Sequence, residues 1–324
     1  MTASAQAASA DGLPFPRRIW AIVAISFGTS LFVIDGAIAN VALPTIGRDL
    51  GVSDGMVTNV VTVYQLVLVM FLLPFASVGD RIGHRNIYQA GQFVFLLASL
   101  ATLLAHNFAI LLVVRVFQAL GAGMALSVSS AMLREVYPAR QLGSGMGINS
   151  VIVASSASLA PTLGGYIVAH FDWHWVFVAA APMAAMSLLL GRALPDPVAQ
   201  EGKHEWLSAA WSAASFLLVV GGLQLTTHST TAVAGFTSLA VGLLSIVLLV
   251  RRERKRTDPV VPVDLLAMPT LGLSALGAIC AFIAITSLLL VLPFRFEGAM
   301  GYSPDEVGLL LLPFPLPMLF VAPA

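Results

Sequence analysis

Asp35 is the residue whose type and position most directly indicate chemistry. It follows the mostly apolar segment Ile19 to Ile34. A carboxylate within such a segment costs several kcal/mol at the centre of a bilayer unless it faces a cavity or a partner. Burial disfavours its charged form, so the group could bind and release protons. We expect a site for protons or cationic substrates. The alternatives are partial solvation near a helix end and permanent pairing with a neighbouring helix.

Arg115 is a second ionisable residue in an apolar segment, with Gln118 three residues further on the same helical face. An arginine keeps its charge, so the guanidinium group must meet a carboxylate, backbone carbonyls or water. Pairing with Asp35 and a fixed bond to backbone carbonyls are both open.

A polar face is expected in the segment that follows Asp54. Thr58, Thr62 and Gln65 recur at spacings of four and three residues, beside Tyr64. Such a face could line a water-filled path, or its side chains could form hydrogen bonds between helices.

A stripe of small residues predicts close helix packing in a later segment. Its members are Gly143, Gly147, Ser150, Ala154, Ser158, Pro161 and Gly165. Pro161 removes a backbone donor, and Gly164 with Gly165 loosens the next turn, so a bend is expected. A bend on a smooth face suits a helix that slides or rocks; static tight packing is the alternative.

Enzyme chemistry finds little support in the sequence. The six histidines are scattered over loops and segment ends, and Cys280 is the single cysteine. There is no Gly-x-Ser-x-Gly motif and no phosphate-binding loop ending in Gly-Lys-Ser/Thr. We expect no catalytic residues, no metal or other cofactor, no nucleic-acid partner and no direct use of ATP.

The elements that must position these residues are membrane-spanning helices. The 324 residues are 58% apolar and 10% charged, whereas a soluble domain has about 45–50% and about 25%. Since a helical span needs about 20 apolar residues, we expect an all-α integral membrane protein. Its ten expected spans are 19–43, 57–78, 87–105, 108–132, 143–168, 175–193, 207–226, 232–250, 268–293 and 307–324.

The distribution of charge predicts the orientation of these spans. Of the 16 Lys and Arg residues, thirteen fall on the side of the amino terminus, two on the opposite side, and Arg115 within a span. The positive-inside rule therefore predicts a cytoplasmic amino terminus. Asp35 and Arg115 are the ionisable residues expected within spans, and Glu297 is assigned to a loop on the far side.

Five motifs in order resemble those of the major facilitator superfamily, and within it the fourteen-span drug/proton antiporters. They occupy residues 34–44, 76–85, 115–118, 160–165 and 173–177. The first is Asp35 followed by Asn-Val-Ala-Leu-Pro, and the second contains the sequence Gly-Asp-Arg-Ile-Gly-His-Arg. Among the departures, Arg295 and Glu297 stand where that family usually has Tyr and Gln.

The resemblance implies two six-helix bundles that rock around a central cavity, with a two-helix insert between them. The implied parts are a tail at 1–18, the first bundle at 19–193, a linker at 194–206, the insert at 207–250, a basic loop at 251–267 and the start of the second bundle at 268–324. The resemblance also implies that the chain is the first part of a longer, fourteen-span protein.

The resemblance assigns roles to three groups of residues. Candidates for proton coupling or substrate binding are Asp35, Arg115, Gln118, Asn40, Tyr64 and Gln65. The implied conformational hinge comprises Pro161, Gly164, Gly165 and Gly147. The implied cytoplasmic latch comprises Asp80, Arg81, Gly83 and Arg85.

The expected function is secondary active transport in the inner (plasma) membrane: proton-driven export of small amphipathic or cationic compounds by a monomer. Small-molecule substrates, protons and the lipid bilayer are the expected partners. One alternative is an exporter of a single metabolite. Another is a non-transporting receptor or scaffold, which would leave Asp35 unexplained.

Overall fold

The computed structural model describes residues 12–196, 206–226, 231–253, 268–311 and 313. Every regular element within these ranges is helical, which confirms the all-α class. The main helices are α2 (Arg17–Asp49), α3 (Asp54–Val57), α4 (Asn59–Ile82), α5 (His84–Ala101), α6 (Phe108–Val136), α7 (Leu142–His170), α8 (His174–Val178), α9 (Ala181–Leu190), α10 (Trp206–Thr226), α11 (Ala232–Glu253), α13 (Pro269–Phe294) and α14 (Pro304–Leu311). Short helical turns are η2 (Thr102–Leu104), η3 (Ala139–Gln141), η4 (Gly191–Ala193) and η5 (Arg295–Ala299).

Nine helical segments of the described chain are long and apolar enough to cross a membrane. They correspond to the first nine expected spans, and the sixth is built from α8, α9 and η4. Most of the tenth expected span, 307–324, lies outside the described residues, as do residues 1–11, 197–205 and 254–267 of the expected tail, linker and basic loop.

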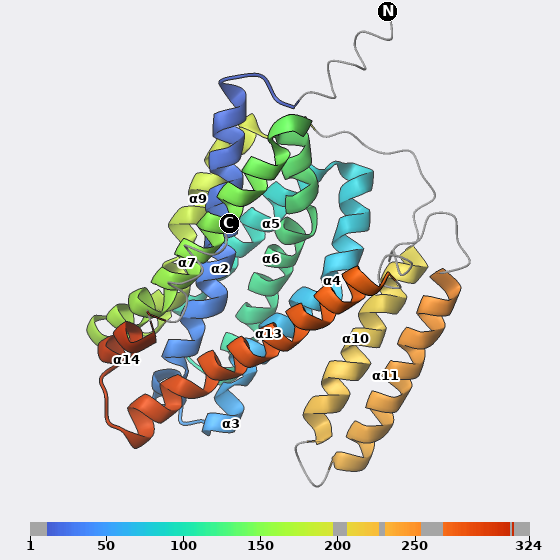
Figure 1. Ribbon diagram of the computed structural model, residues 1–324. Coiled ribbons are helices and arrows are strands. Elements are labelled where there is room, and N and C mark those ends of the chain that lie inside the picture. The colour runs from blue at the N-terminus through green and yellow to red at the C-terminus, as the bar shows by residue number, and fades with distance from the viewer. Residues whose placement is uncertain (1–11, 197–205, 227–230, 254–267, 312, 314–324) are drawn as a thin grey trace, which may run out of the picture.

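The first six spans pack into a bundle around α2, the long blue helix in the left half of Figure 1. Helix α2 contacts α7, α9, α6 and α4, while α5 packs against α6. The two clusters of buried side chains in this bundle both include α2, at Leu31 and Phe32 in one and at Ile38 and Leu43 in the other. Helix α2 is therefore buried along most of its length, and a polar side chain in its buried part must find a partner within protein.

The hairpin of α10 and α11 lies beside α4 (Figure 1). Helix α13 crosses the bundle obliquely in the same view and contacts α2. Helix α14 packs on α7 at the end of the bundle where α3 lies. The division of the chain into two bundles and an insert stays a prediction.

The ninth span is longer than the sequence predicts. Helix α13 continues through Pro293 to Phe294, and the π-helical turn η5 extends the candidate span to Ala299. Glu297 therefore belongs to a candidate span and is buried. The expectation that Glu297 lies in a loop is wrong, because the helix continues past Pro293.

Candidate functional site

An ion pair between Asp35 of α2 and Arg115 of α6 is buried in the bundle. Arg115 Nη1 lies 3.2 Å from Asp35 Oδ1 and 3.1 Å from Oδ2. The side chain of Arg115 is 1% exposed and that of Asp35 is 0% exposed. Of the arrangements that the sequence left open for Asp35, the structure contains the pair with a neighbouring helix, and partial solvation is wrong.

The remaining contacts of Arg115 enclose its charge. Its Nε donates to the Val60 carbonyl at 3.2 Å and its Nη1 to Gln118 Oε1 at 2.9 Å. The guanidinium carbon lies 4.2 Å from the ring centre of Tyr64 and 5.0 Å from that of Phe177, within reach of cation–π attraction. A carboxylate and a backbone carbonyl thus both bind Arg115, so the two possibilities considered from sequence occur together.

Gln118 connects the ion pair to a third helix. Its Nε2 donates to Ser99 Oγ of α5 at 3.2 Å, and both side chains are 0% exposed. In such surroundings the desolvation of two charges offsets much of their attraction, but removing one partner alone costs about 3–5 kcal/mol. The pair is stable only while both members are charged and in contact.

Of the other residues predicted to take part in coupling, Tyr64 contacts the ion pair, whereas Asn40 and Gln65 do not. Tyr64 is buried, and its ring centre lies 4.2 Å from the guanidinium carbon of Arg115. Asn40 donates to the Gly36 carbonyl of its own helix at 3.4 Å. Gln65 is exposed. Successive helical residues point about 100° apart, so the helix that buries Tyr64 turns Gln65 away.

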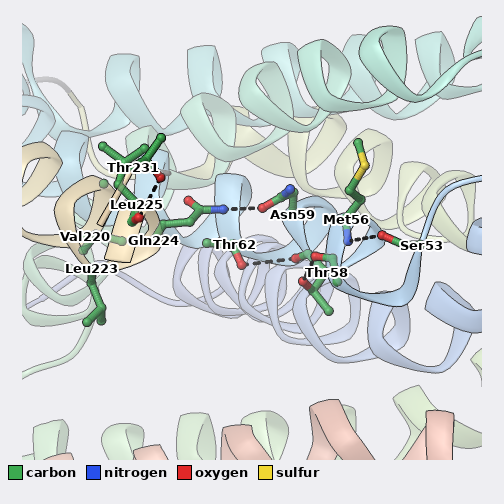
Figure 2. Close-up of a pocket in the computed structure, with 12 residues that line it drawn as sticks. Ser53, Met56, Thr58, Asn59, Thr62, Val220, Leu223, Gln224, Leu225 and Thr231 are labelled. Atoms are coloured by element: carbon green, nitrogen blue, oxygen red, sulfur yellow. Dashed lines mark hydrogen bonds between the residues drawn. The ribbon is translucent and has the colours of Figure 1, made fainter. Parts of the chain in front are cut away.

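The polar face of α4 lines a cleft against α10 (Figure 2). The cleft has a volume of about 910 Å³ and includes Thr58 and Thr62, but not Asp35. Asn59 accepts a hydrogen bond from Gln224 across it. Thr58 and Thr62 donate to backbone carbonyls of their own segment, at Gly55 and Thr58, and Asn59 supplies the hydrogen bond between α4 and the α10–α11 hairpin. A water-filled path along this polar face stays a prediction.

The small-residue stripe of α7 is packed along only part of its length. A Cβ atom at Gly164 would lie 2.8 Å from Ile38 Cγ1, and one at Gly165 would lie 2.2 Å from the Pro304 carbonyl oxygen. By contrast, a Cβ at Gly143 or Gly147 would meet no atom within 4 Å. Close packing therefore involves the end of α7 near α14, and the predicted continuous contact is absent at Gly147 among the described residues.

Part of the predicted latch forms a histidine-centred cluster. His84 Nδ1 lies 2.6 Å from Glu135 Oε1 of α6, and its Nε2 lies 3.0 Å from Asp80 Oδ1 of α4. Since both ring nitrogens face carboxylate oxygens, the cationic imidazolium, which donates from both, matches this geometry. Sequence reasoning identified Asp80 but missed His84 and Glu135; the position of His84 next to Arg85, within the charged segment 80–85, was the available signal.

A second set of charges ties the beginning of α2 to the end of the sixth span. Arg17 Nη2 lies 2.9 Å and Arg85 Nη1 3.2 Å from Asp196 Oδ1. The hydrogen bond and charge of Arg17, with the charge of Arg85, lower the pKa of Asp196 below its ordinary value.

Arg81 is exposed and has no ion pair with a described residue. Gly83 has φ of 93°, a conformation that favours glycine, and turns the chain from α4 into α5. The structure therefore joins Asp80 and Arg85 to different clusters.

The arrangement can perform proton and charge-pair chemistry. A buried carboxylate with one cationic partner can exist as an ion pair or, once protonated, as a neutral acid beside a free guanidinium group. Among the described residues, no three His, Cys, Asp or Glu side chains are grouped as metal ligands would be. These features define a class: helical multi-pass membrane proteins with a charge pair buried among their spans.

The comparison with protein families identifies the particular group. The family model of the Major Facilitator Superfamily matches residues 25–324. The chain belongs to this superfamily and is a multi-pass membrane transporter.

The names of individual relatives describe different activities. The chain is 39% identical over 317 residues to the uncharacterized transporter YebQ of Escherichia coli, covering 97% of this chain and 69% of the relative. It is 27% identical to the riboflavin transporter RibZ of Clostridioides difficile, covering 95% and 67%. It is 30% identical to the puromycin resistance protein pur8 of Streptomyces alboniger, covering 94% of this chain and 61% of that protein.

A solved structure supports the fold. The peptide transporter POT in complex with sulfate matches with a TM-score of 0.62 and 16% identity, over 98% of this chain and 70% of that chain. Identity at this level concerns the architecture alone.

Proposed function

We propose that the protein exports small amphipathic or cationic compounds in exchange for protons, by alternating access. It is driven by the proton gradient, needs no cofactor, and resides in the inner (plasma) membrane as a monomer. The observation that carries the proposal is the buried Asp35–Arg115 pair.

The pair suits proton coupling because its two states differ in what Arg115 can bind. While Asp35 is ionised, it holds Nη1 of Arg115. A proton on Asp35 removes the charge that balances the guanidinium group. An unbalanced buried charge is unfavourable, so α2 and α6 are expected to rearrange around Gln118 and Tyr64. Proton binding to Asp35 is thereby expected to change the arrangement of α2 and α6.

The uneven packing of α7 supports alternating access. Its end near α14 is closely packed, whereas Gly143 and Gly147 face open space. The His84 and Asp196 clusters lie at the amino-terminal end of α2, where they can act as the cytoplasmic latch. The excess of Lys and Arg at this end supports a cytoplasmic amino terminus.

The test is proton release driven by substrate. The full-length protein is placed in inverted membrane vesicles whose lumen is acidified, and a panel of cationic and amphipathic compounds is added. A compound that is exported should make the lumen more alkaline, as measured with a pH-sensitive dye. Asp35→Asn should abolish this signal at every pH, because an amide does not exchange protons, and Asp35→Glu should retain part of it.

Asp54→Asn is the matched control, because it makes the same change at an exposed carboxylate. It should preserve the signal. An unchanged proton signal in Asp35→Asn would contradict the proposal, as would the absence of any exported compound together with unaltered drug accumulation in an efflux-deficient host.

A second candidate is export of one specific compound, favoured by the similarity to a relative named as a riboflavin transporter. The same panel separates the two. Responses to several unrelated compounds support broad export, whereas a response to one compound supports the specific exporter.

A further inference from the structure

A second ion pair on α2 lies far from Asp35, at the other end of the helix. Arg48 Nη2 is 2.9 Å from Glu297 Oε2. Arg48 is in the last turn of α2, and Glu297 lies in η5 at the end of the ninth span. Asp35 and Arg48 are thirteen residues apart, which is about 20 Å along a helix. The pair therefore joins the first span to the ninth at a depth different from that of the central site.

The two partners differ in their access to solvent. The Glu297 side chain is 3% exposed and that of Arg48 is 67% exposed. Oε1 of Glu297 is buried and has no hydrogen-bond partner among the described residues. A buried carboxylate oxygen without a donor is unfavourable, and more so when the group is charged. A proton on Glu297 removes that charge, and Arg48 can then be solvated.

The helices around this pair pack closely against one another. A Cβ atom at Gly308 of α14 would lie 2.6 Å from the Pro161 carbonyl oxygen of α7, and Thr162 Oγ1 donates to the Gly308 carbonyl at 3.2 Å. Val41 of α2 packs with Val307 and Leu311 of α14 in one buried cluster. Contacts between the first six spans and the segment after residue 268 thus gather at the end that carries Arg48.

The charged or titratable groups on the elements packed here have other partners or are exposed. Asp49 of α2 accepts a hydrogen bond from Trp173 Nε1 at 2.8 Å, and Glu306 of α14 accepts from Ser303. Tyr166 and His170 of α7 and Arg295 of η5 are exposed, and Asp305 of α14 interacts with Ser303. Among all these groups, Arg48 is the one that forms an ion pair with Glu297.

We propose that Glu297 is a second proton-binding site, and that its protonation releases Arg48 and lets α13 and α14 separate from α2 and α7 at this end. In the step, a proton is transferred to the Glu297 carboxylate, and the ion pair is replaced by a neutral carboxyl group and a solvated guanidinium. The inference rests on the proposed proton-driven function for its driving force. π-Helical turns such as η5 are frequent at functional sites, in keeping with this role.

The experiment measures opening directly, not transport. In the full-length protein, Cys280→Ser removes the exposed native cysteine of this chain, and Val307→Cys places a reporter in the closed contact, where Val307 is 0% exposed. Labelling by a membrane-impermeant thiol reagent is followed from each side of the membrane at decreasing pH, and each rate is divided by that of free cysteine at the same pH, because the thiolate is the reactive form. Labelling from the side of Arg48 should rise about fivefold in acid, as expected for the loss of a pair with one exposed partner.

The variants separate a proton site from simple packing. Glu297→Gln should be highly labelled at every pH, with no remaining pH dependence. Combining Arg48→Glu with Glu297→Arg should restore low labelling at neutral pH, because opposite charges face each other again. Arg295→Gln, an exposed neighbour on the same turn, should behave as the parent. Leu311→Cys serves as a second reporter if Val307→Cys does not fold.

Each result has one meaning. Labelling that keeps its pH dependence in Glu297→Gln overturns the inference. If labelling depends on pH through Glu297 but no compound drives proton release, the inference holds and the proposed export function fails. If Asp35-dependent export is found while labelling is independent of pH, export holds and the inference fails.

Discussion

The two ion pairs on α2 have similar chemistry in different surroundings. In the central pair both side chains are at most 1% exposed, and Val60, Gln118 and the ring of Tyr64 complete the contacts of Arg115. In the outer pair, Arg48 is 67% exposed and one oxygen of Glu297 has no partner among the described residues. Both link the first span to another span.

The difference shows that burial, not distance, decides how easily each pair opens. The shortest N–O distances are 3.1 Å and 2.9 Å, so contact length alone ranks the outer pair as the stronger. Separation of the central pair leaves a buried charge without a partner, whereas Arg48 can exchange Glu297 for water at little cost. The central pair should resist opening until a proton arrives, and the outer pair should open readily.

The largest effect is expected from Arg115→Gln. It leaves Asp35 buried without its cation, which should lower the free energy of unfolding by about 3–5 kcal/mol. Thermal unfolding of the purified protein in detergent measures the loss. Adding Asp35→Asn should recover much of it, since no unpaired charge then remains. Equal stability of the single and double variants would show that the central pair is not the reason for the loss.

A smaller loss is expected from Gly165→Ala. The added Cβ would lie 2.2 Å from the backbone oxygen of Pro304, so α14 must move. Overpacking of this kind costs about 1–3 kcal/mol. Gly147→Ala on the same helix meets no atom within 4 Å, and its effect should stay within about 0.5 kcal/mol. Similar losses in the two variants, measured by thermal unfolding, would contradict the uneven packing of α7.

Arg48→Gln tests the outer pair directly against Arg115→Gln. Because Arg48 is largely exposed and Glu297 can take up a proton in its absence, we expect a loss of about 1 kcal/mol at neutral pH. Denaturation of the two variants under identical conditions provides the comparison. A loss at Arg48 as large as that at Arg115 would remove the distinction between the pairs.

The smallest effect is expected at the other end of α2. The hydrogen bond and charge of Arg17, with the charge of Arg85, lower the pKa of Asp196 from 3.8. A depressed carboxyl pKa stabilises the fold at pH values above the unfolded pKa, and the stabilisation disappears as pH falls through the folded pKa. Asp196→Asn should therefore lower the melting temperature slightly at neutral pH and not in strong acid.

Arg81→Gln is the control for Asp196→Asn, because Arg81 is exposed without an ion pair to a described residue. It should leave the melting temperature and its pH dependence unchanged. A difference between Asp196→Asn and the parent that persists unchanged in strong acid would mean that the pair with Arg17 is not its source.

Sequence predicted much of the fold and four residues of the central site: Asp35, Arg115, Gln118 and Tyr64. The apolar segments predicted the nine helical segments that can cross a membrane. Asp35 and Arg115 were identified because a charged side chain in lipid is unfavourable. The sequence did not separate Tyr64 from Gln65, because the side of α4 that is buried depends on its neighbours. It also missed Glu297, because the expected span ends with the apolar run at residue 293, whereas α13 and η5 continue the helix beyond it.

The sequence by itself determined that the chain lies in a lipid bilayer and that its elements are helices. A chain this apolar must form helices, because these satisfy their own backbone hydrogen bonds in lipid. Tertiary structure alone decided which charges meet. Arg115 reaches Asp35 across 80 positions, and Arg48 reaches Glu297 across 249. Hydropathy depends on local composition, whereas an ion pair depends on how helices distant in sequence are rotated and packed.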